Sequence, residues 1–242
     1  ETGQTKFLVD CGLFQGDKFA AEANLRPFDF AVAEIDFLLL THAHADHCGM
    51  LPVLVREGFK GKIYCTAATA DITKFILLDA ANIQENDALY YNKHLLPGQA
   101  HIKPLYTEQD VKKVSGHFQP VPYFRLSGQW TQLTPGLRFK LYDAGHILGS
   151  AITLLEFTEN GATKRLVFTG DLGRHFLPIL RDPEFVAEPA EMLITECTYG
   201  SRIHKPVADL EGELTSIVRQ AVAQKSKIIV PTFSLGRSQE LI

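Results

Sequence analysis

The feature that most constrains the fold is a group of four potential metal ligands within six positions, directly after the apolar run 35–40. These ligands are His42, His44, Asp46 and His47. Residues two apart in an extended chain point to the same side, so His42 and His44 can bind one ion together, whereas in a helix they would diverge. Asp46 and His47 follow the strand, where a turn can direct both to a second ion. The pattern predicts a two-metal centre at the carboxyl end of a strand, and imidazole with carboxylate favours zinc.

Four other predicted strands also end in ionisable residues. These are Asp10 after 6–9, His146 after 137–142, Asp171 after 164–169 and Glu196 at the end of 192–196. Together with the histidine cluster, five predicted strands are thus followed by ionisable side chains. We therefore expect these side chains to lie together at one edge of the molecule.

The residue types suggest different roles at that edge. Glycines beside His146 allow the backbone to turn sharply and approach an ion closely, which favours a ligand. Asp171 is the candidate bridge, because two ions ~3.5 to 4 Å apart need a short anionic group between them. Asp10 is expected either as a ligand or as a residue that supports one. His175 and His204 are expected to support the ligands or contact the substrate.

Periodicity outlines the rest of the chain. Apolar residues at three- and four-residue steps predict a helix over 68–87, with Ile72, Phe75, Ile76, Asp79 and Ile83 on its amphipathic face. Further helices are expected at 50–57 and at 107–114, the second opened by a capping box of Thr107 and Asp110. Additional strands are expected at 62–66, 121–126, 151–157 and from residue 228, the last followed by a turn and the opening of a helix. Strands flanked by helical segments predict a sheet-on-sheet core with helices outside, a four-layer α/β arrangement.

Composition narrows the class of protein. The chain is 45% hydrophobic and 21% charged over 242 residues, as in ordinary globular proteins, and has no apolar run near the ~20 residues of a membrane span. Its four cysteines lack Cys-x-x-Cys spacing, which favours free thiols and a cytoplasmic location, and Cys48 is expected to be buried and apolar. The net charge of -4 argues against nucleic-acid binding by bulk basic attraction. It does not exclude a nucleic-acid enzyme, because two dications add positive charge at the site.

The sequence resembles the metallo-β-lactamase-fold hydrolases, and more closely their β-CASP branch of RNA- and DNA-processing nucleases. His-x-His-x-Asp-His with a downstream Gly-His and Gly-Asp carries the superfamily resemblance. The segments around Asp10 and Glu196 are similar to RNA-processing members such as the cleavage-and-polyadenylation endonuclease and its bacterial relatives. The matching segments are 9–16, 41–47, 144–150, 168–174, 195–200 and 230–237.

The resemblance implies an αββα sandwich over residues 1–206 and the start of an inserted α/β β-CASP domain over 207–242, with the chain cut at both ends. The implied ligands are His42, His44 and His146 for one zinc and Asp46 and His47 for the other, with Asp171 as the bridge. Asp10 would orient the ligand histidines. Glu196 would be the acid of the first β-CASP motif, which pairs with a histidine that this sequence does not reach, and the second zinc would lack one protein ligand.

The implied activity is hydrolysis of RNA phosphodiesters by a hydroxide between two zinc ions, with Asp46 also accepting a hydrogen bond from the nucleophile. Alternatives are a DNA nuclease, a hydrolase of a small thioester, lactone or β-lactam, and a catalytically silent scaffold. The long segment 68–124 argues against small substrates, and the full set of six ligand positions argues against a scaffold. Expected partners are RNA or DNA and a second copy or a processing complex, with no membrane.

Overall fold

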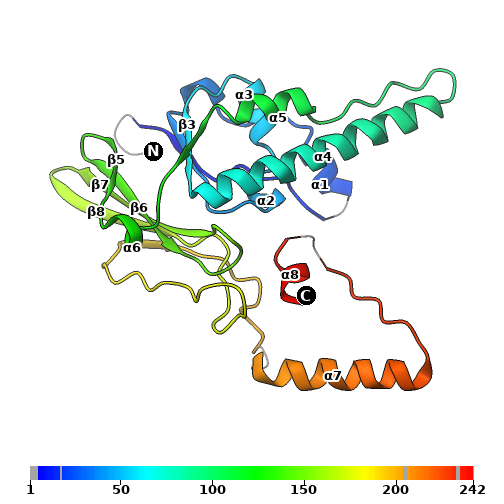
Figure 1. The fold of residues 1–242 in the computed structure, drawn as a ribbon. Helices are drawn as coiled ribbons and strands as arrows, with labels where there is room; N and C mark the ends of the chain where they lie inside the picture. Colours follow the sequence, from blue (N-terminus) through cyan, green and yellow to red (C-terminus); the bar gives the residue numbers. More distant parts are fainter. Residues whose placement is uncertain (1–4, 17, 204–206, 233–234, 242) are drawn as a thin grey trace.

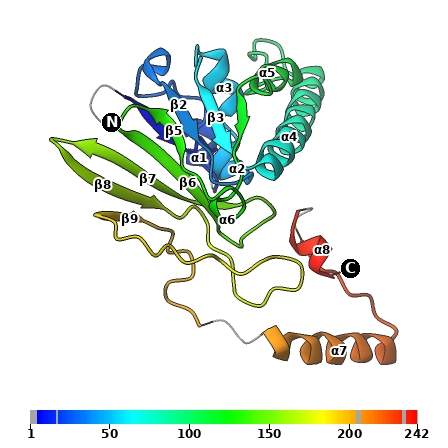
Figure 2. The same ribbon diagram turned by 60° about the vertical axis from the view of Figure 1, so that its left-hand side comes forward.

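Two β-sheets packed face to face form the body of the protein, with most helices on the outer side of the first sheet (Figures 1 and 2). The structure is a computed structural model that describes residues 5–16, 18–203, 207–232 and 235–241. Three of the apolar clusters define its layers. The first lies between helices and sheet, the second between the sheets, and the third on the outer face of the second sheet.

The first sheet is wholly parallel. Its strands, in spatial order, are β1 (Phe7–Val9), β2 (Phe37–Leu39), β3 (Lys62–Cys65) and β4 (Phe118–Pro120). The connections carry α1 (Lys18–Ala23), η1 (Val32–Glu34), α2 (Ala45–Cys48), α3 (Leu51–Arg56), α4 (Ala67–Lys93) and α5 (Glu108–Val114). Because all four strands run in one direction, their carboxyl ends share one edge.

The second sheet is mostly antiparallel. Its strands, in spatial order, are β5 (Thr131–Thr134), β6 (Leu137–Asp143), β7 (Ala151–Glu159), β8 (Ala162–Phe168) and β9 (Met192–Ile194), with α6 (Phe124–Ser127) ahead of β5. Both β6 and β8 are antiparallel to β7, and β9 is parallel to β8. Strands β6, β8 and β9 therefore also end at a common edge.

Irregular chain between β8 and β9 covers the outer face of the second sheet. Glu188 in this coil pairs with Lys140, whose side chain is buried, and accepts a hydrogen bond from the Tyr142 hydroxyl at 2.7 Å. Glu184 accepts from the backbone N–H of Asp143, and Glu191 accepts from that of Arg165. Three carboxylates thus fasten the coil to β6 and β8.

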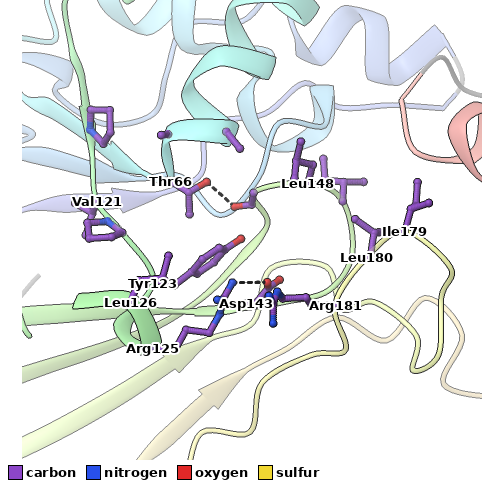
Figure 3. Close-up of a pocket in the computed structure, with 16 residues that line it drawn as sticks. Thr66, Val121, Tyr123, Arg125, Leu126, Asp143, Leu148, Ile179, Leu180 and Arg181 are labelled. Carbon is purple, nitrogen blue, oxygen red and sulfur yellow. Dashed lines mark hydrogen bonds and ion pairs between the residues drawn. The ribbon is translucent and has the colours of Figure 1, made fainter. Parts of the chain in front are cut away.

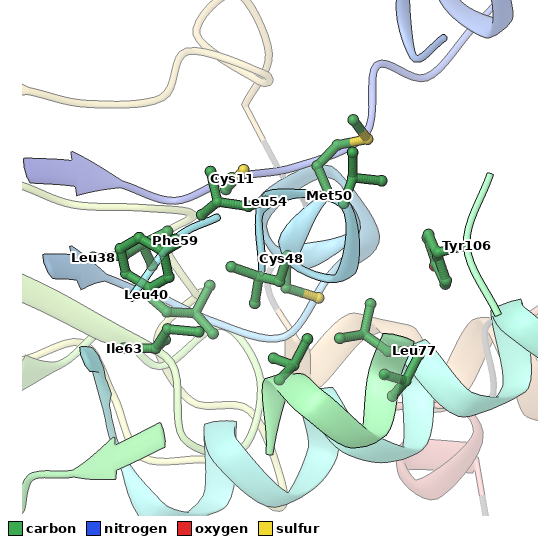
Figure 4. Packing of buried hydrophobic residues seen from close by; sticks show 14 of the residues in the cluster. Cys11, Leu38, Leu40, Cys48, Met50, Leu54, Phe59, Ile63, Leu77 and Tyr106 are labelled. Carbon is green, nitrogen blue, oxygen red and sulfur yellow. The ribbon is translucent and has the colours of Figure 1, made fainter. Parts of the chain in front are cut away.

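Strand β2 is buried on both faces, which explains its continuous apolar sequence. Phe37 and Leu39 pack against the second sheet. Leu38 packs with the helices on the other side, in the core that Figure 4 shows. Cys48 is fully buried in this core, as expected, and all four cysteines are free thiols.

The predicted packing face of the long helix is wrong, although the helix itself is confirmed and extends to Lys93. Phe75 is 73% exposed and Ile83 is 53% exposed. The residues that α4 buries are mainly small: Thr69, Ala70, Thr73, Leu77, Ala81 and Ala88. Small side chains let α4 approach its neighbours closely. The face of α4 that packs against the core is therefore the one with small residues and not the one with the large apolar residues.

Two predicted strands are also wrong. Residues 121–123 form no strand and Phe124–Ser127 is α6, whereas β4 forms just before them, at Phe118–Pro120, because β3 pairs there. Residues 228–232 form no strand, and no described strand pairs with them. The capping box of Thr107 and Asp110 at the start of α5 is confirmed.

Helix α7 (Val207–Gln224) lies apart from the two-sheet body in both views, and α8 (Arg237–Leu241) follows it (Figures 1 and 2). The predicted domain boundary between residues 206 and 207 stays a prediction, since 204–206 lie outside the described residues. Within the described ranges, no helix combines the length and apolar character that a membrane crossing needs.

Candidate metal centre

One edge of the sandwich gathers the chain segments that follow β2, β6 and β8. The segment after β2 carries His42 and His44, the loop after β6 carries His146, and the turn after β8 carries Asp171. These four residues form the only group of three or more His, Cys, Asp or Glu ligand atoms gathered this closely in the described part of the chain. Loops that follow strands of both sheets therefore contribute to one site.

The four ligand atoms have the spacing of a single metal position. The Nδ1 atom of His44 lies 3.0 Å from His42 Nε2 and 3.1 Å from His146 Nε2. Asp171 Oδ2 lies 3.7 Å from His42 Nε2 and 3.4 Å from His146 Nε2. Ligand atoms around a tetrahedral zinc with bonds of ~2.0–2.1 Å are separated by about 3.3 Å, so these residues fit one ion.

A second group of candidate ligands lies on the other side of Asp171. Its Oδ1 atom is 3.2 Å from His47 Nε2, while its Oδ2 atom faces His42 and His146. Asp46 Oδ2 is 3.9 Å from His47 Nε2, and its side chain is 48% exposed at the rim. The short helix α2 presents both residues. The two oxygens of Asp171 thus face two different groups of ligands, the arrangement that a bridging carboxylate requires.

Asp10 and Thr41 lie directly behind these ligands. Asp10 Oδ2 is 2.7 Å from His47 Nδ1, and Asp10 Oδ1 accepts a hydrogen bond from the Thr41 backbone N–H at 2.7 Å. Asp10 has a positive φ of 63°, a conformation that Asp tolerates better than most residues. The sequence patterns selected Asp10 but not Thr41. The only signal for Thr41 was its position between the strand and the first ligand.

Burial and charge set the protonation of the imidazoles in the metal-free site. Burial, and then the positive charge of His47, lowers the pKa of His42 to about 2. Burial also lowers the pKa of His44 and of His146. All three rings are therefore neutral near pH 7, the form that binds a metal ion.

His47 and Asp171 form a charged pair in the same metal-free site. Burial opposes the charge on His47, but hydrogen bonds with Asp10 and Asp171 outweigh it and raise its pKa to about 10. The hydrogen bond from the protonated His47 outweighs the opposing effect of burial and lowers the pKa of Asp171 to about 2. Asp171 is thus ionised near neutral pH, and an ion that binds His47 must displace its proton.

Close backbone contact holds the two loops of the second sheet together. The backbone N–H of Gly173 donates to the Ala144 carbonyl at 2.8 Å, and a Cβ on Gly173 would lie 1.7 Å from the Gly145 carbonyl oxygen. Only glycine permits this approach. The contact fixes the Asp171 turn against the loop of His146.

The remaining candidates lie outside the ligand cluster. Glu196 Oε1 accepts a hydrogen bond from the Leu172 backbone N–H at 2.8 Å, so it supports the turn next to Asp171. His175 is 3.3 Å from Asp182 and largely exposed, which contradicts a supporting role at the ligands. His204 lies outside the described residues.

The sequence profile described as "Metallo-beta-lactamase superfamily" matches residues 1–232. The chain belongs to the metallo-β-lactamase superfamily. The expected fold class and the presence of a metal-binding His/Asp cluster are thereby confirmed. A solved subclass B3 metallo-β-lactamase from a soil metagenome library is 19% identical, covers 69% of this chain and 53% of its own, and has a TM-score of 0.39.

Curated relatives agree with the expected branch of the superfamily. "Ribonuclease TTHA0252" of Thermus thermophilus is 35% identical over 99% of this chain and 49% of its own. "Transcription termination factor FttA" of Methanocaldococcus jannaschii is 30% identical over 100% of this chain and 36% of its own. "Cleavage and polyadenylation specificity factor 73" of Drosophila melanogaster is 33% identical over 98% of this chain and 31% of its own. The resemblance to β-CASP nucleases is confirmed, and the chain spans half or less of each of these relatives.

A cavity of about 520 Å³ adjoins the His146 loop of this metallo-β-lactamase fold (Figure 3). Leu148 and Gly149 form one wall, and the start of α4 and α6 form others. The Thr66 hydroxyl donates to the Gly149 carbonyl at 2.8 Å, which ties the loop to the first turn of α4. Arg125 in the cavity is paired with Asp143. The His146 loop is therefore held on one side by the start of α4 and on the other by the Asp171 turn.

Proposed function

We propose that this chain carries the metal centre of a zinc-dependent nuclease that hydrolyses RNA phosphodiesters. The observation that carries the proposal is the convergence of three imidazole nitrogens and one carboxylate oxygen, all within 4.8 Å of one another, on a metallo-β-lactamase fold. RNA as the substrate is supported by the names of two relatives, a ribonuclease and a cleavage and polyadenylation factor. Because the chain spans half or less of these relatives, the activity is proposed for the whole protein.

The site would hold two zinc ions. His42, His44 and His146 would hold one ion and Asp46 and His47 the other, with Asp171 between them. Support comes from Asp171, whose Oδ2 faces His146 at 3.4 Å while its Oδ1 faces His47 at 3.2 Å. When bound, zinc lowers the pKa of water toward neutrality and offsets negative charge on phosphoryl oxygens.

The other residues at the edge orient these ligands or meet the substrate. Asp10 accepts a hydrogen bond from His47 Nδ1–H, and the Nε2 atom of His47 is then directed at the site. Asp46, exposed at the rim, would also accept a hydrogen bond from the attacking water. Glu196 holds the backbone next to Asp171 and so keeps that carboxylate between the two ligand groups. We further assign residues 1–206 to the metallo-β-lactamase domain and 207–242 to the start of a β-CASP domain, in a cytoplasmic protein.

The test is cleavage of a labelled RNA with and without zinc, together with the zinc content of the purified protein. Asp171→Asn removes one anionic ligand oxygen and is expected to lower the cleavage rate by about 100-fold or more and to reduce the bound zinc. Asp71→Asn is the matched control, since Asp71 is exposed on α4 and pairs only with Lys74 in the described structure. Full cleavage by the Asp171→Asn protein would disprove the assignment.

Assays of the same protein with other substrates distinguish an RNA nuclease from the alternative functions. Cleavage of single-stranded DNA without cleavage of RNA would identify a DNA nuclease on the same site. Turnover of a thioester, lactone or β-lactam without nuclease activity would identify a small-molecule hydrolase. Zinc binding without turnover of any of these substrates would identify a scaffold.

A further inference from the structure

Thr41 lies where the first sheet, the ligand segment and the second sheet meet. Its side chain is buried, and its backbone is held at both ends. The N–H donates to Asp10 Oδ1 at 2.7 Å, and the carbonyl accepts from the N–H of Ala151 in β7 at 2.9 Å. A Cβ on Gly170, next to Asp171, would come within 2.7 Å of the Thr41 Cβ. The position of the Thr41 hydroxyl is therefore fixed by the fold.

The Thr41 hydroxyl lies 2.8 Å from Asp10 Oδ2 and 3.0 Å from His42 Nδ1, with His47 Nδ1 farther away at 3.5 Å. A hydroxyl carries one proton and also accepts, whereas an ionised carboxylate only accepts. The hydroxyl must therefore donate to Asp10, which leaves an oxygen lone pair facing His42 Nδ1. That contact is a hydrogen bond only when the neutral imidazole of His42 carries its proton on Nδ1.

This proton position decides whether His42 is a ligand. Its Nε2 atom lies 3.0 Å from His44 Nδ1 and 3.7 Å from Asp171 Oδ2, inside the ligand group. With the proton on Nδ1, the Nε2 lone pair is free to bind an ion. With the proton on Nε2, an N–H would occupy the centre of the site and block that lone pair.

The two neighbouring histidines are set differently. His47 reaches Asp10 Oδ2 directly, at 2.7 Å from its Nδ1, and needs no intermediary. His44 presents Nδ1 to the site, so it requires the opposite tautomer from His42. Three histidines within six positions must therefore place their protons in two different ways, and His42 is the one whose partner is a hydroxyl.

We propose that Thr41 is a positioning residue of the metal centre: its hydroxyl, oriented by Asp10, keeps the His42 proton on Nδ1 and so keeps Nε2 open for the ion. This inference rests on the proposed metal centre, but not on RNA as the substrate. Asp10 thus prepares both metal positions, one directly through His47 and the other through Thr41.

The test reads the tautomer first, without metal. Long-range ¹H–¹⁵N NMR of the metal-free protein assigns the protonated nitrogen of His42. The wild-type protein and Thr41→Ser, which retains the hydroxyl, are expected to carry the proton on Nδ1. Thr41→Val, which keeps the shape and removes the hydroxyl, is expected to lose this preference. Thr41→Ala is a second hydroxyl-free variant for the case in which valine does not fold.

Zinc affinity, measured by competition with a chelating dye, is the second readout. The hydroxyl-free variants are expected to bind zinc about 10-fold or more weakly, and Thr41→Ser to retain the wild-type affinity. Thr153→Val is the matched control, because Thr153 is equally buried and its hydroxyl has no hydrogen-bond partner among the described residues. A hydroxyl-free variant that folds and keeps the Nδ1–H tautomer overturns the proposal, as does one that keeps wild-type zinc affinity. Failure of the RNA assay alone leaves both readouts intact and counts against the proposed substrate only.

Discussion

At the scale of single residues, the candidate site combines three neutral rings, one buried and two half-buried, with one charged pair. His42, His44 and His146 all have pKa values lowered by burial, whereas hydrogen bonds with two carboxylates raise the pKa of His47. His42, His44 and His146 bind a proton less readily in the folded protein than in the unfolded chain. Without metal, acid therefore favours the unfolded chain at these three positions.

This asymmetry predicts the acid stability of the metal-free protein. Below the ordinary histidine pKa of 6.5, the unfolded chain binds a proton at His42 and the folded state does not, because its folded pKa is about 2. The contribution of His42 is therefore unchanged above pH 6.5 and becomes destabilising as the pH drops, by up to about 1.4 kcal/mol per pH unit. Urea unfolding with a chelator present, between about pH 5 and pH 7, measures the slope.

His42→Asn is expected to make that slope shallower by about one proton. His101→Asn, at an exposed position in the loop after α4, is the matched control and is expected to leave the slope unchanged. Equal slopes for His42→Asn and the wild-type protein would contradict the burial argument.

The sequence indicated the candidate ligands more directly than the residues that contact them. His42 and His44 are recognisable because imidazole and carboxylate at that spacing are the functional groups that metal ions require. Thr41 carries no such signal, since a hydroxyl becomes informative only when its neighbours in space are known. The same applied to His175, which follows Asp171 in sequence but lies against Asp182 in the fold.

At the scale of elements, the carboxyl ends of the strands place the candidate ligands at one edge. Glycines allow the loops that carry these ligands to pack closely together. Strands with strong apolar patterns, such as β2 and β7, were predictable because burial dictates their composition. Strand β4 is three residues long and depends on pairing with β3, which no local pattern reveals. Helix α4 was predictable in extent but not in orientation, because small residues rather than large apolar ones face its neighbours.

Gly149 tests how the His146 loop is seated on α4. It has φ of +90°, and a Cβ there would lie 2.6 Å from the Thr69 backbone nitrogen. Gly161, in the turn between β7 and β8, has φ of +77° but open space around the same position. Both alanine substitutions carry backbone strain of about 1–2 kcal/mol. Only Gly149→Ala also overpacks, which adds about 1–3 kcal/mol and displaces the loop of His146.

Urea unfolding and zinc affinity measured on both variants separate strain from displacement. Gly149→Ala is expected to be the less stable variant and to bind zinc more weakly, whereas Gly161→Ala is expected to keep the wild-type zinc affinity. Equal losses for the two variants would show that the contact with α4 does not position the loop.

At the scale of the whole molecule, the candidate metal position joins the two sheets. His42 and His44 follow β2 of the first sheet, while His146 and Asp171 follow β6 and β8 of the second. Between the sheets, the apolar residues of the middle cluster supply the rest of the contact. A bound ion therefore adds a link that the unfolded chain lacks.

Removal of metal is accordingly expected to lower the melting temperature. An ion present at about 100 times its dissociation constant stabilises the folded state by about 2.7 kcal/mol. For a chain of this size that corresponds to a shift of about 5–11 °C. Thermal unfolding in excess zinc and in excess chelator measures it. Asp171→Asn is expected to reduce the shift and Asp71→Asn to keep it; a shift of wild-type size in Asp171→Asn would place the ion elsewhere.

The coil between β8 and β9 has a consequence that reaches beyond the face it covers. It starts at the turn that holds Asp171 and ends at the strand that precedes Glu196, and Glu184, Glu188 and Glu191 fasten it to the sheet in between. The chain that connects the Asp171 turn to Glu196 is therefore fixed on the outer face of the second sheet. A substitution of the buried Lys140 in β6 removes the ion pair with Glu188. We therefore expect it to weaken the attachment of the coil that follows Asp171 at the candidate metal centre.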